Sequence, residues 1–212
     1  MVRVRVRQHV NPLSFKYQQP LDIPDWSNIY AELNQPLHLD LGAARGKFLQ
    51  SLAQIHSNYN YLGLEIREPL VKAANLETEE LGLNNVYFLF ANANNYIGKI
   101  LASIPELKLQ VITIQFPDPW FKTRHSKRQI VQPDLVKVLL EYLQPEGIIF
   151  LQSDVHKVAE YMSQQFLNYP DFTEKFSHSW LDNNPFPVAT EREKLTLAQN
   201  QPVYRILIKK QA

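Results

Sequence analysis

From residue 37 onward, short apolar runs rich in β-branched residues alternate with segments whose apolar side chains recur every three or four positions. The short runs predict strands, and the recurring segments predict helices. The predicted strands cover residues 37–41, 61–65, 86–90, 109–116 and 147–153. The predicted helices cover residues 48–55, 67–81, 95–103, 133–143 and 155–167. Repeated alternation of strand and helix is typical of an α/β fold, in which a parallel sheet has helices on both faces.

The start of the chain departs from this alternation. Residues 1–36 are polar and irregular, and Arg3, Arg5 and Arg7 alternate there with valines. We expect this segment to form a basic N-terminal arm. The remainder, residues 37–212, is predicted to form a single α/β domain.

Weaker patterns complete the predicted elements. Residues 25–33 predict a short helix that Asp25 caps. Residues 172–177 and 203–208 predict an antiparallel hairpin that closes the sheet around a long loop. With this hairpin, the expected sheet is mostly parallel and has seven strands.

Composition narrows the class of protein. The 212 residues are 45% hydrophobic and 20% charged, which is ordinary for a globular domain. The absence of cysteine excludes disulfides, thiol nucleophiles and cysteine-ligated zinc. Together with the lack of an apolar signal or membrane segment, it leads us to expect a cytoplasmic protein. The net charge of +1 does not by itself indicate a nucleic-acid partner, so such a partner has to be argued from local clusters.

Polar residues lie where four of the predicted strands end, namely Asp40, Glu65, Asn92 and Asp118. The carboxyl ends of parallel strands meet at one edge of a sheet, where ligands bind. Glu65 suits the paired hydroxyls of a ribose, Asn92 suits an adenine edge, and Asp40 suits a cationic ligand. Taken alone, Glu65 could begin a solvated helix and Asn92 could be a helix cap. The ordered set indicates a cofactor that contains adenosine.

The loop after the first strand discriminates between two classes of cofactor. Gly42 and Gly46 allow a tight turn and a close approach to a ligand, although they could be ordinary turn glycines. The dinucleotide fingerprint Gly-x-Gly-x-x-Gly is not met, because Ala44 lies between them. A nicotinamide oxidoreductase is therefore disfavoured. S-adenosylmethionine requires no pyrophosphate cradle, and the acidic and amide groups at the strand ends suit it better.

Residues 116–128 combine three features that recognise a nucleotide. Asp118 lies between two prolines and can accept hydrogen bonds from a base edge, while Phe116 and Trp120 could stack on a base. Trp120 could equally be an ordinary core residue. The cations that follow, and that we expect to hold phosphates, are Lys122, Arg124, Lys127 and Arg128. The simpler interpretation of this run is a solvated charge cluster.

The chain resembles the bacterial tRNA (guanine-N7-)-methyltransferases over nearly its whole length. The segments that carry the resemblance are residues 7–13, 39–48, 63–65, 116–128 and 190–193, and the fourth of these is the most specific. The chain departs from the family pattern at Ala44, where a glycine is common, and that substitution could loosen the approach of the backbone to the cofactor.

The resemblance implies a Rossmann-like class I methyltransferase fold for residues 37–212. It implies transfer of a methyl group from S-adenosylmethionine to N7 of a guanosine in the tRNA variable loop. The positions that match cofactor-contacting or active-site residues are Asp40, Glu65, Asn92 and Asp118, and we add Gly42 from the loop spacing. The positions that match substrate-contacting residues are Lys122, Asp154, Thr190 and Glu193. Asp154 could instead cap the following helix.

This activity gives Asp118 a defined catalytic role. Guanine N7 carries a lone pair and no proton, so the reaction needs positioning rather than a general base. We expect Asp118 to orient guanine by accepting from N1–H and the exocyclic amine, a pair of donors that adenine does not present. We expect the tRNA phosphates to contact Arg3, Arg5, Arg7, Arg124, Lys127 and Arg128.

Two alternatives remain open from the sequence. One is a non-catalytic RNA-binding protein that keeps the fold, and the other is a methyltransferase that acts on another RNA base or on a small molecule. The basic run argues against a small molecule. The oligomeric state is expected to be a monomer or a homodimer, with no metal and no membrane partner.

Overall fold

The computed structural model describes residues 10–120, 123–174 and 180–211. They contain a seven-stranded sheet in the order β3-β2-β1-β4-β5-β7-β6. The strands are β1 (Leu37–Leu41), β2 (Asn60–Glu65), β3 (Val86–Phe90), β4 (Leu109–Gln115), β5 (Leu143–Ser153), β6 (Phe172–Glu174) and β7 (Tyr204–Lys210). The first five pair in parallel, and β7 runs antiparallel to both β5 and β6. The predicted fold class, including the closing hairpin, is confirmed.

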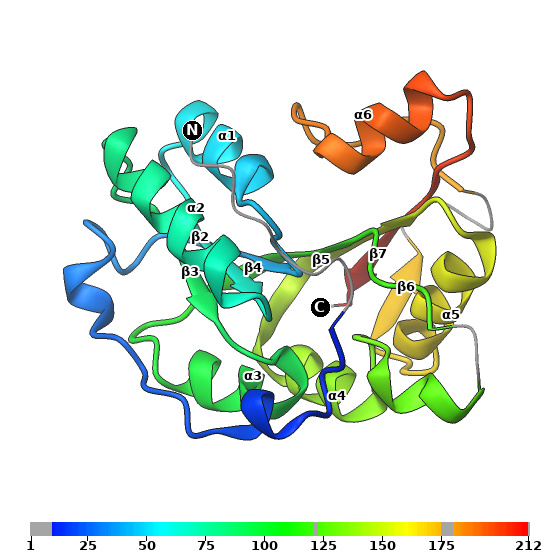
Figure 1. Cartoon of the computed structure of the whole chain (residues 1–212), viewed down its shortest axis with the longest axis horizontal. Helices are drawn as coiled ribbons and strands as arrows, with labels where there is room; N and C mark the ends of the chain where they lie inside the picture. Colours follow the sequence, from blue (N-terminus) through cyan, green and yellow to red (C-terminus); the bar gives the residue numbers. More distant parts are fainter. Residues whose placement is uncertain (1–9, 121–122, 175–179, 212) are drawn as a thin grey trace.

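Helices cover both faces of the sheet. They are α1 (Lys47–Ile55), α2 (Glu68–Glu80), α3 (Ala93–Ala102), α4 (Pro133–Tyr142), α5 (His156–Leu167) and α6 (Glu191–Ala198). In Figure 1, α1 and α2 lie on one side of the sheet, and α3 and α4 lie on the other. The buried apolar residues form two clusters that match these sides, because one cluster includes Phe48 and Val71 and the other includes Ile97 and Leu139. Burial of these apolar faces is what drives the layers together.

One predicted helix is shorter in the structure, and one helix of the structure was not predicted. The helix expected over residues 25–33 is only a 3-10 helix, Trp26–Asn28, although Asp25 does cap it by accepting from Ser27 N at 3.0 Å. Helix α6 was not predicted, because its burial pattern is inverted. It buries Glu193 and exposes Leu195, so apolar periodicity cannot reveal it.

The segment before β1 packs onto the domain. Trp26 and Tyr30 are each 3% exposed and belong to the same apolar cluster as the α3 and α4 residues. Trp26 Nε1 donates to Ser103 Oγ at 2.9 Å, and the Tyr30 hydroxyl donates to the Tyr61 carbonyl at 3.1 Å. The predicted phosphate contacts Arg3, Arg5 and Arg7 lie outside the described residues. Residues 10–36 thus contribute to the core and run along the outer side of α3, whose Asn95 and Lys99 side chains donate to carbonyls of this segment (Figure 1).

The strand order reverses between β1 and β4, which are hydrogen-bonded neighbours although β2 and β3 separate them in the chain. The loop that leaves β1 passes close to the sheet at Gly46, which has a φ of 77°. A Cβ at Gly46 would lie 2.5 Å from Cζ of the buried Phe88 ring. Both the left-handed backbone and the lack of a side chain are therefore required for the loop to reach the carboxyl edge.

The substitution Gly46→Ala should lower the free energy of unfolding by about 2–4 kcal/mol, from left-handed strain together with overlap on Phe88. The matched control is Gly82→Ala, where φ is 65° and a Cβ would have no neighbour within 4 Å. That control should lose only about 1–2 kcal/mol in urea unfolding. Equal losses for the two variants would contradict the packing requirement at Gly46.

Candidate active site

Asp40 is a buried carboxylate at the end of β1. It is 4% exposed and accepts from Thr113 Oγ1 on the adjacent β4 at 2.6 Å. Burial raises the pKa of Asp40 to about 6, and the nearby Thr113 and Gln115 side chains oppose that rise. Gln115 Nε2 is near enough to influence the carboxyl but has no partner at normal hydrogen-bond distance and angle. The end of β1 thus presents an acidic group that a cationic ligand would keep ionised.

Glu65 connects the end of β2 to the loop after β1. It is 3% exposed, and its Oε2 accepts from Ala44 N at 2.9 Å. The side chain of Arg67 donates to both carboxylate oxygens, from Nε at 2.9 Å and from Nη2 at 3.0 Å, and Arg67 N donates to Oε1 at 2.9 Å. Ala44 itself has a φ of 50°, a left-handed conformation in which glycine would be less strained. The hydrogen bond from Ala44 N to Glu65 helps to hold Ala44 in this left-handed conformation.

Asn92 is both a helix cap and a link to the N-terminal segment. Its Oδ1 accepts from Asn94 N at the start of α3, at 3.2 Å, and its Nδ2 donates to the Pro12 carbonyl at 3.0 Å. Asn92 therefore caps α3, as the alternative interpretation of the sequence held. Asn92 also lines a cavity beside Glu65, so capping does not remove it from the candidate site.

Two cavities adjoin at the carboxyl edge of the sheet. The smaller contains Glu65 and Asn92, and the larger contains Asp40, Asp154 and Thr190. The residues that line both are Gly42, Arg67, Gln115, Phe116, Pro117 and Asp118. The structure therefore brings the predicted site residues to two compartments with a shared wall.

The shared wall is built on a strained backbone. Phe116, at the end of β4, has a φ of 49°, which is unusual for an aromatic residue. Phe116 N donates to the Gln152 carbonyl at 2.8 Å, which ties this turn to β5. Pro117 and Pro119 flank Asp118 and restrict the backbone on either side of its carboxylate. Such strain persists only where the surroundings enforce it, and it is typical of functional sites.

The basic run forms a 3-10 helix, Thr123–Arg128, beside the smaller cavity. Arg124 and Lys127 are exposed, whereas Arg128 lies over the Trp120 ring at 5.0 Å and lines that cavity. Lys122 lies outside the described residues. The run is thus divided into two outward cations and one cation held at the pocket by an aromatic ring.

Asp154 follows β5 and faces the larger cavity. Its Oδ2 accepts from Arg192 Nε at 3.1 Å and also from Arg192 Nη2. The α5 cap position is Val155, and no side chain makes a capping bond there. The alternative in which Asp154 caps the following helix is therefore wrong.

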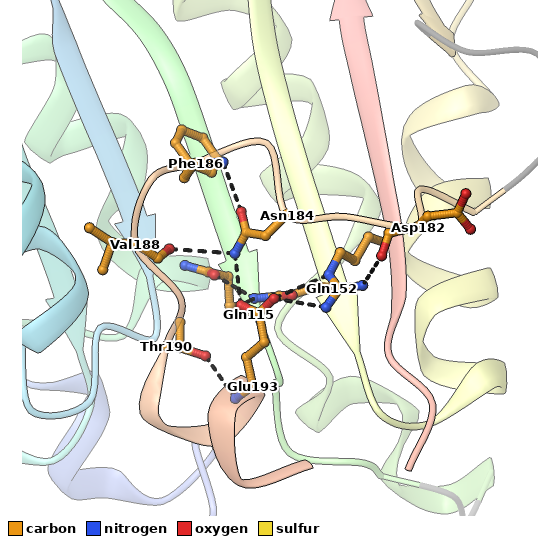
Figure 2. Close-up of polar contacts among 9 residues, drawn as sticks. Gln115, Gln152, Asp182, Asn184, Phe186, Val188, Thr190 and Glu193 are labelled. Atoms are coloured by element: carbon orange, nitrogen blue, oxygen red, sulfur yellow. Dashed lines mark hydrogen bonds and ion pairs between the residues drawn. The ribbon is translucent and has the colours of Figure 1, made fainter. Parts of the chain in front are cut away.

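Thr190 and Glu193 have different environments although they belong to one predicted motif. Thr190 is the N-cap of α6, accepts from Glu193 N at 3.1 Å, and lines the larger cavity. Glu193 is 1% exposed and lies behind the cavity wall in a polar network (Figure 2). Its Oε1 accepts from Arg205 Nη2 at 2.8 Å, and its Oε2 accepts from Asn184 Nδ2 at 2.7 Å and Gln152 Nε2 at 3.2 Å.

Several site residues were missed from the sequence. Arg67 follows Glu65 by two positions, and this proximity is the signal that could have indicated an ion pair. The Thr190-x-x-Glu193 spacing is that of a helix capping box and could have located α6. The positions of Gln115 and Gln152 side by side on β4 and β5 had no sequence signal, because the pairing register of the strands decides it.

The described parts of the chain contain no membrane-spanning helix and no cluster of acidic or histidine side chains arranged for a metal. The helices there lack the length and apolar character that a membrane span needs. Within the residues that the structure describes, no group of three or more His, Asp or Glu side chains is placed to hold a metal ion.

Comparison with known sequences identifies a family. Residues 34–206 match the family described as "Putative methyltransferase". The tRNA (guanine-N(7)-)-methyltransferase of Microcystis aeruginosa is 53% identical over 209 residues, which cover 99% of each chain. The protein of the same name from Thermosynechococcus vestitus is 53% identical over 202 residues, 95% of this chain and 93% of that one.

Solved structures support the fold at low sequence identity. The 16S rRNA methyltransferase KamB superposes with a TM-score of 0.61 at 12% identity, covering 92% of this chain and 98% of its own. A Streptococcus mutans protein described as "a putative methyltransferase", in complex with SAH, gives a TM-score of 0.51 at 14% identity, covering 87% of this chain and 94% of its own. The family match over residues 34–206 and the relatives that are 53% identical over nearly the whole chain show that this chain belongs to the tRNA (guanine-N7-)-methyltransferase family.

Proposed function

We propose that this protein transfers the methyl group of S-adenosylmethionine to N7 of a guanosine in the variable loop of tRNA. The observation that carries the proposal is the 53% identity to a named tRNA (guanine-N(7)-)-methyltransferase across 99% of both chains. The adjoining cavities supply a location for the reaction, because a methyl donor and a base must meet at a common boundary.

The direct test uses labelled S-adenosylmethionine with bulk tRNA, followed by reductive chain scission at N7-methylguanosine. Label in the variable loop would support the proposal. If the protein binds tRNA but gives no heat with S-adenosylmethionine in calorimetry, it is an RNA-binding protein on the same fold. Label on another base would redirect the proposal to a different RNA substrate.

The smaller cavity fits the adenosine part of the cofactor. Glu65 can accept from the ribose hydroxyls, and Asn92 lies where an adenine edge would be recognised. Because Arg67 already donates to both oxygens of Glu65, its guanidinium must release at least one of them to a ribose. Gly42 is part of the shared wall, and Asp40 lies in the larger cavity, where its buried carboxylate suits the ammonium group of the cofactor. Gln115 Nε2, in the shared wall, offers a further donor.

The chemistry requires positioning more than proton transfer. The bound cofactor supplies an electrophilic methyl group on a sulfonium, and guanine N7 has a lone pair available at neutral pH. Asp118 orients the base by accepting from N1–H and the exocyclic amine, so that N7 points along the shared wall. Adenine would leave this carboxylate without its donors, which accounts for selectivity.

The larger cavity takes the guanosine. Asp154 and Thr190 line it and are the proposed contacts, with Lys122 close by in the chain. Glu193 acts through the start of α6, since its oxygens already have partners. Phosphate contacts come from the basic run and from Arg3, Arg5 and Arg7. The tRNA substrate implies a cytoplasmic enzyme, which we propose works as a monomer or a homodimer.

The substitution Asp118→Asn should lower kcat/KM for tRNA by about 10²–10⁴-fold, because the amide places a donor against the donors of guanine. Because Asp118 also lines the smaller cavity, binding of S-adenosylmethionine should weaken as well, but by less than about tenfold, which calorimetry can check. A folded variant that methylates tRNA at the parental rate would show that Asp118 does not contact the base.

Cofactor affinity should depend on pH through Asp40. The pKa of about 6 means that the ionised fraction of this carboxyl rises as pH rises through 6. A cationic ligand favours the ionised form, so the Kd for S-adenosylmethionine should be about tenfold higher at pH 5 than at its plateau near pH 7.5. In Asp40→Asn, binding should be weaker at pH 7.5, and this pH dependence should disappear. An unchanged pH profile in that variant would assign the titration to another group.

Charge reversal of the outward cations should weaken tRNA binding. In the double variant Arg124→Glu, Lys127→Glu, the KM for tRNA should rise about tenfold or more, with little change in kcat, because phosphate contacts position the RNA without taking part in the chemistry. Arg128 is left unchanged because it packs on Trp120. An unaltered KM would remove the basic run from the RNA interface.

A further inference from the structure

Helix α6 begins with two neighbouring side chains that point to different environments. Glu193 is buried and bonded to Arg205, Gln152 and Asn184 (Figure 2). The preceding residue, Arg192, is 59% exposed and lines the larger cavity. The buried anchor at Glu193 therefore fixes the first turn of α6 and holds Arg192 at the cavity.

The partner of Arg192 is itself a candidate ligand for the substrate. Arg192 Nε donates to Asp154 Oδ2 at 3.1 Å, and Nη2 donates to the same oxygen. Asp154 is 20% exposed and lines the cavity that also contains Asp118. Any guanosine that hydrogen-bonds to Asp154 must compete with this guanidinium.

The other cations that line this cavity are Arg45, which is exposed, Lys47 and Arg67, and the last two are engaged with carboxylates. Lys47 is paired with Glu77 on α2, outside the cavity lining, and Arg67 is paired with the buried Glu65. The ion pair of Arg192 is half-exposed, and such pairs contribute little to stability, so exchanging its partner costs little. A base that enters a pocket brings its own phosphates to the rim, where a freed guanidinium can bind them.

We infer that Arg192 exchanges its ion pair with Asp154 for a phosphate of the tRNA backbone when the target guanosine enters the larger cavity. This inference rests on the proposed function. The exchange couples entry of the base to binding of the backbone, because the guanosine bonds to the Asp154 carboxylate while the phosphate bonds to the Arg192 guanidinium. Arg192 is thus a tRNA-contacting residue whose position depends on the buried Glu193 network.

The test measures tRNA methylation by Arg192→Ala, Arg192→Gln and Arg192→Lys between about 50 and about 200 mM salt. For the alanine and glutamine variants, the KM for tRNA should rise about five- to tenfold, with kcat within about twofold. The slope of log KM against log salt should fall by about one. In Arg192→Lys, both the KM and the salt slope should return most of the way to the parental values, because a lysine ammonium can also pair with a phosphate.

The matched control is Lys194→Ala, which removes an exposed cation from the same helix outside the cavity lining. Its KM and salt slope should stay at the parental values. An equal effect in Lys194→Ala and Arg192→Ala would reduce the finding to bulk charge and overturn the inference. The inference would also be overturned if glutamine restored the parental values as completely as lysine does. A loss in kcat with no change in KM would overturn it too, because either outcome means that Arg192 only orients Asp154.

The parental protein in the same assay separates this inference from the proposed function. If it methylates tRNA and Arg192→Ala behaves identically, only the inference is overturned. If the parental protein does not methylate tRNA, the proposed function is overturned, and the exchange at Asp154 with it.

Discussion

The reversal of strand order between β1 and β4 is the constraint on which the site depends. Chain segments that leave β1 and β4 diverge there, so space opens at the carboxyl edge of the sheet. The parallel strands that end at this edge bring polar side chains to it. Asp40, Glu65 and Asp118 are far apart in the chain, yet the parallel register places them around one pair of adjoining cavities.

Concentrating carboxylates at one edge creates an electrostatic problem, which this protein resolves mainly with arginines. Glu65 is paired with Arg67, Asp154 with Arg192, and Glu193 with Arg205. The three pairs differ in burial, and burial decides their role. The Glu193 pair is almost inaccessible to water and cannot be broken cheaply, so it serves as an anchor. The other two line the cavities, where a ligand can compete for the carboxylate.

Much of this arrangement could be predicted, and the failures have physical causes. The parallel strands carry continuous apolar runs, so β3 was predicted at its observed bounds, 86–90. Helix α6 escaped because it buries Glu193 and Thr196 while it exposes Leu195, a pattern opposite to the one that periodicity detects. The conformation of Ala44 also escaped, since its positive φ is held by Glu65, a residue from the next strand.

The sequence by itself determined which groups are available and in which order they reach the edge of the sheet. Apolar runs with polar residues at their ends are local features of the sequence. When such runs become strands of one buried parallel sheet, the polar residues lie at the strand ends, where a ligand can bind. Only the tertiary structure decided which of these groups are already engaged. The bond from Arg67 to Glu65, the burial of Glu193 behind the cavity wall and the meeting of Arg192 with Asp154 depend on distances between separate elements. Those distances follow from register and packing, which no single segment of the chain encodes.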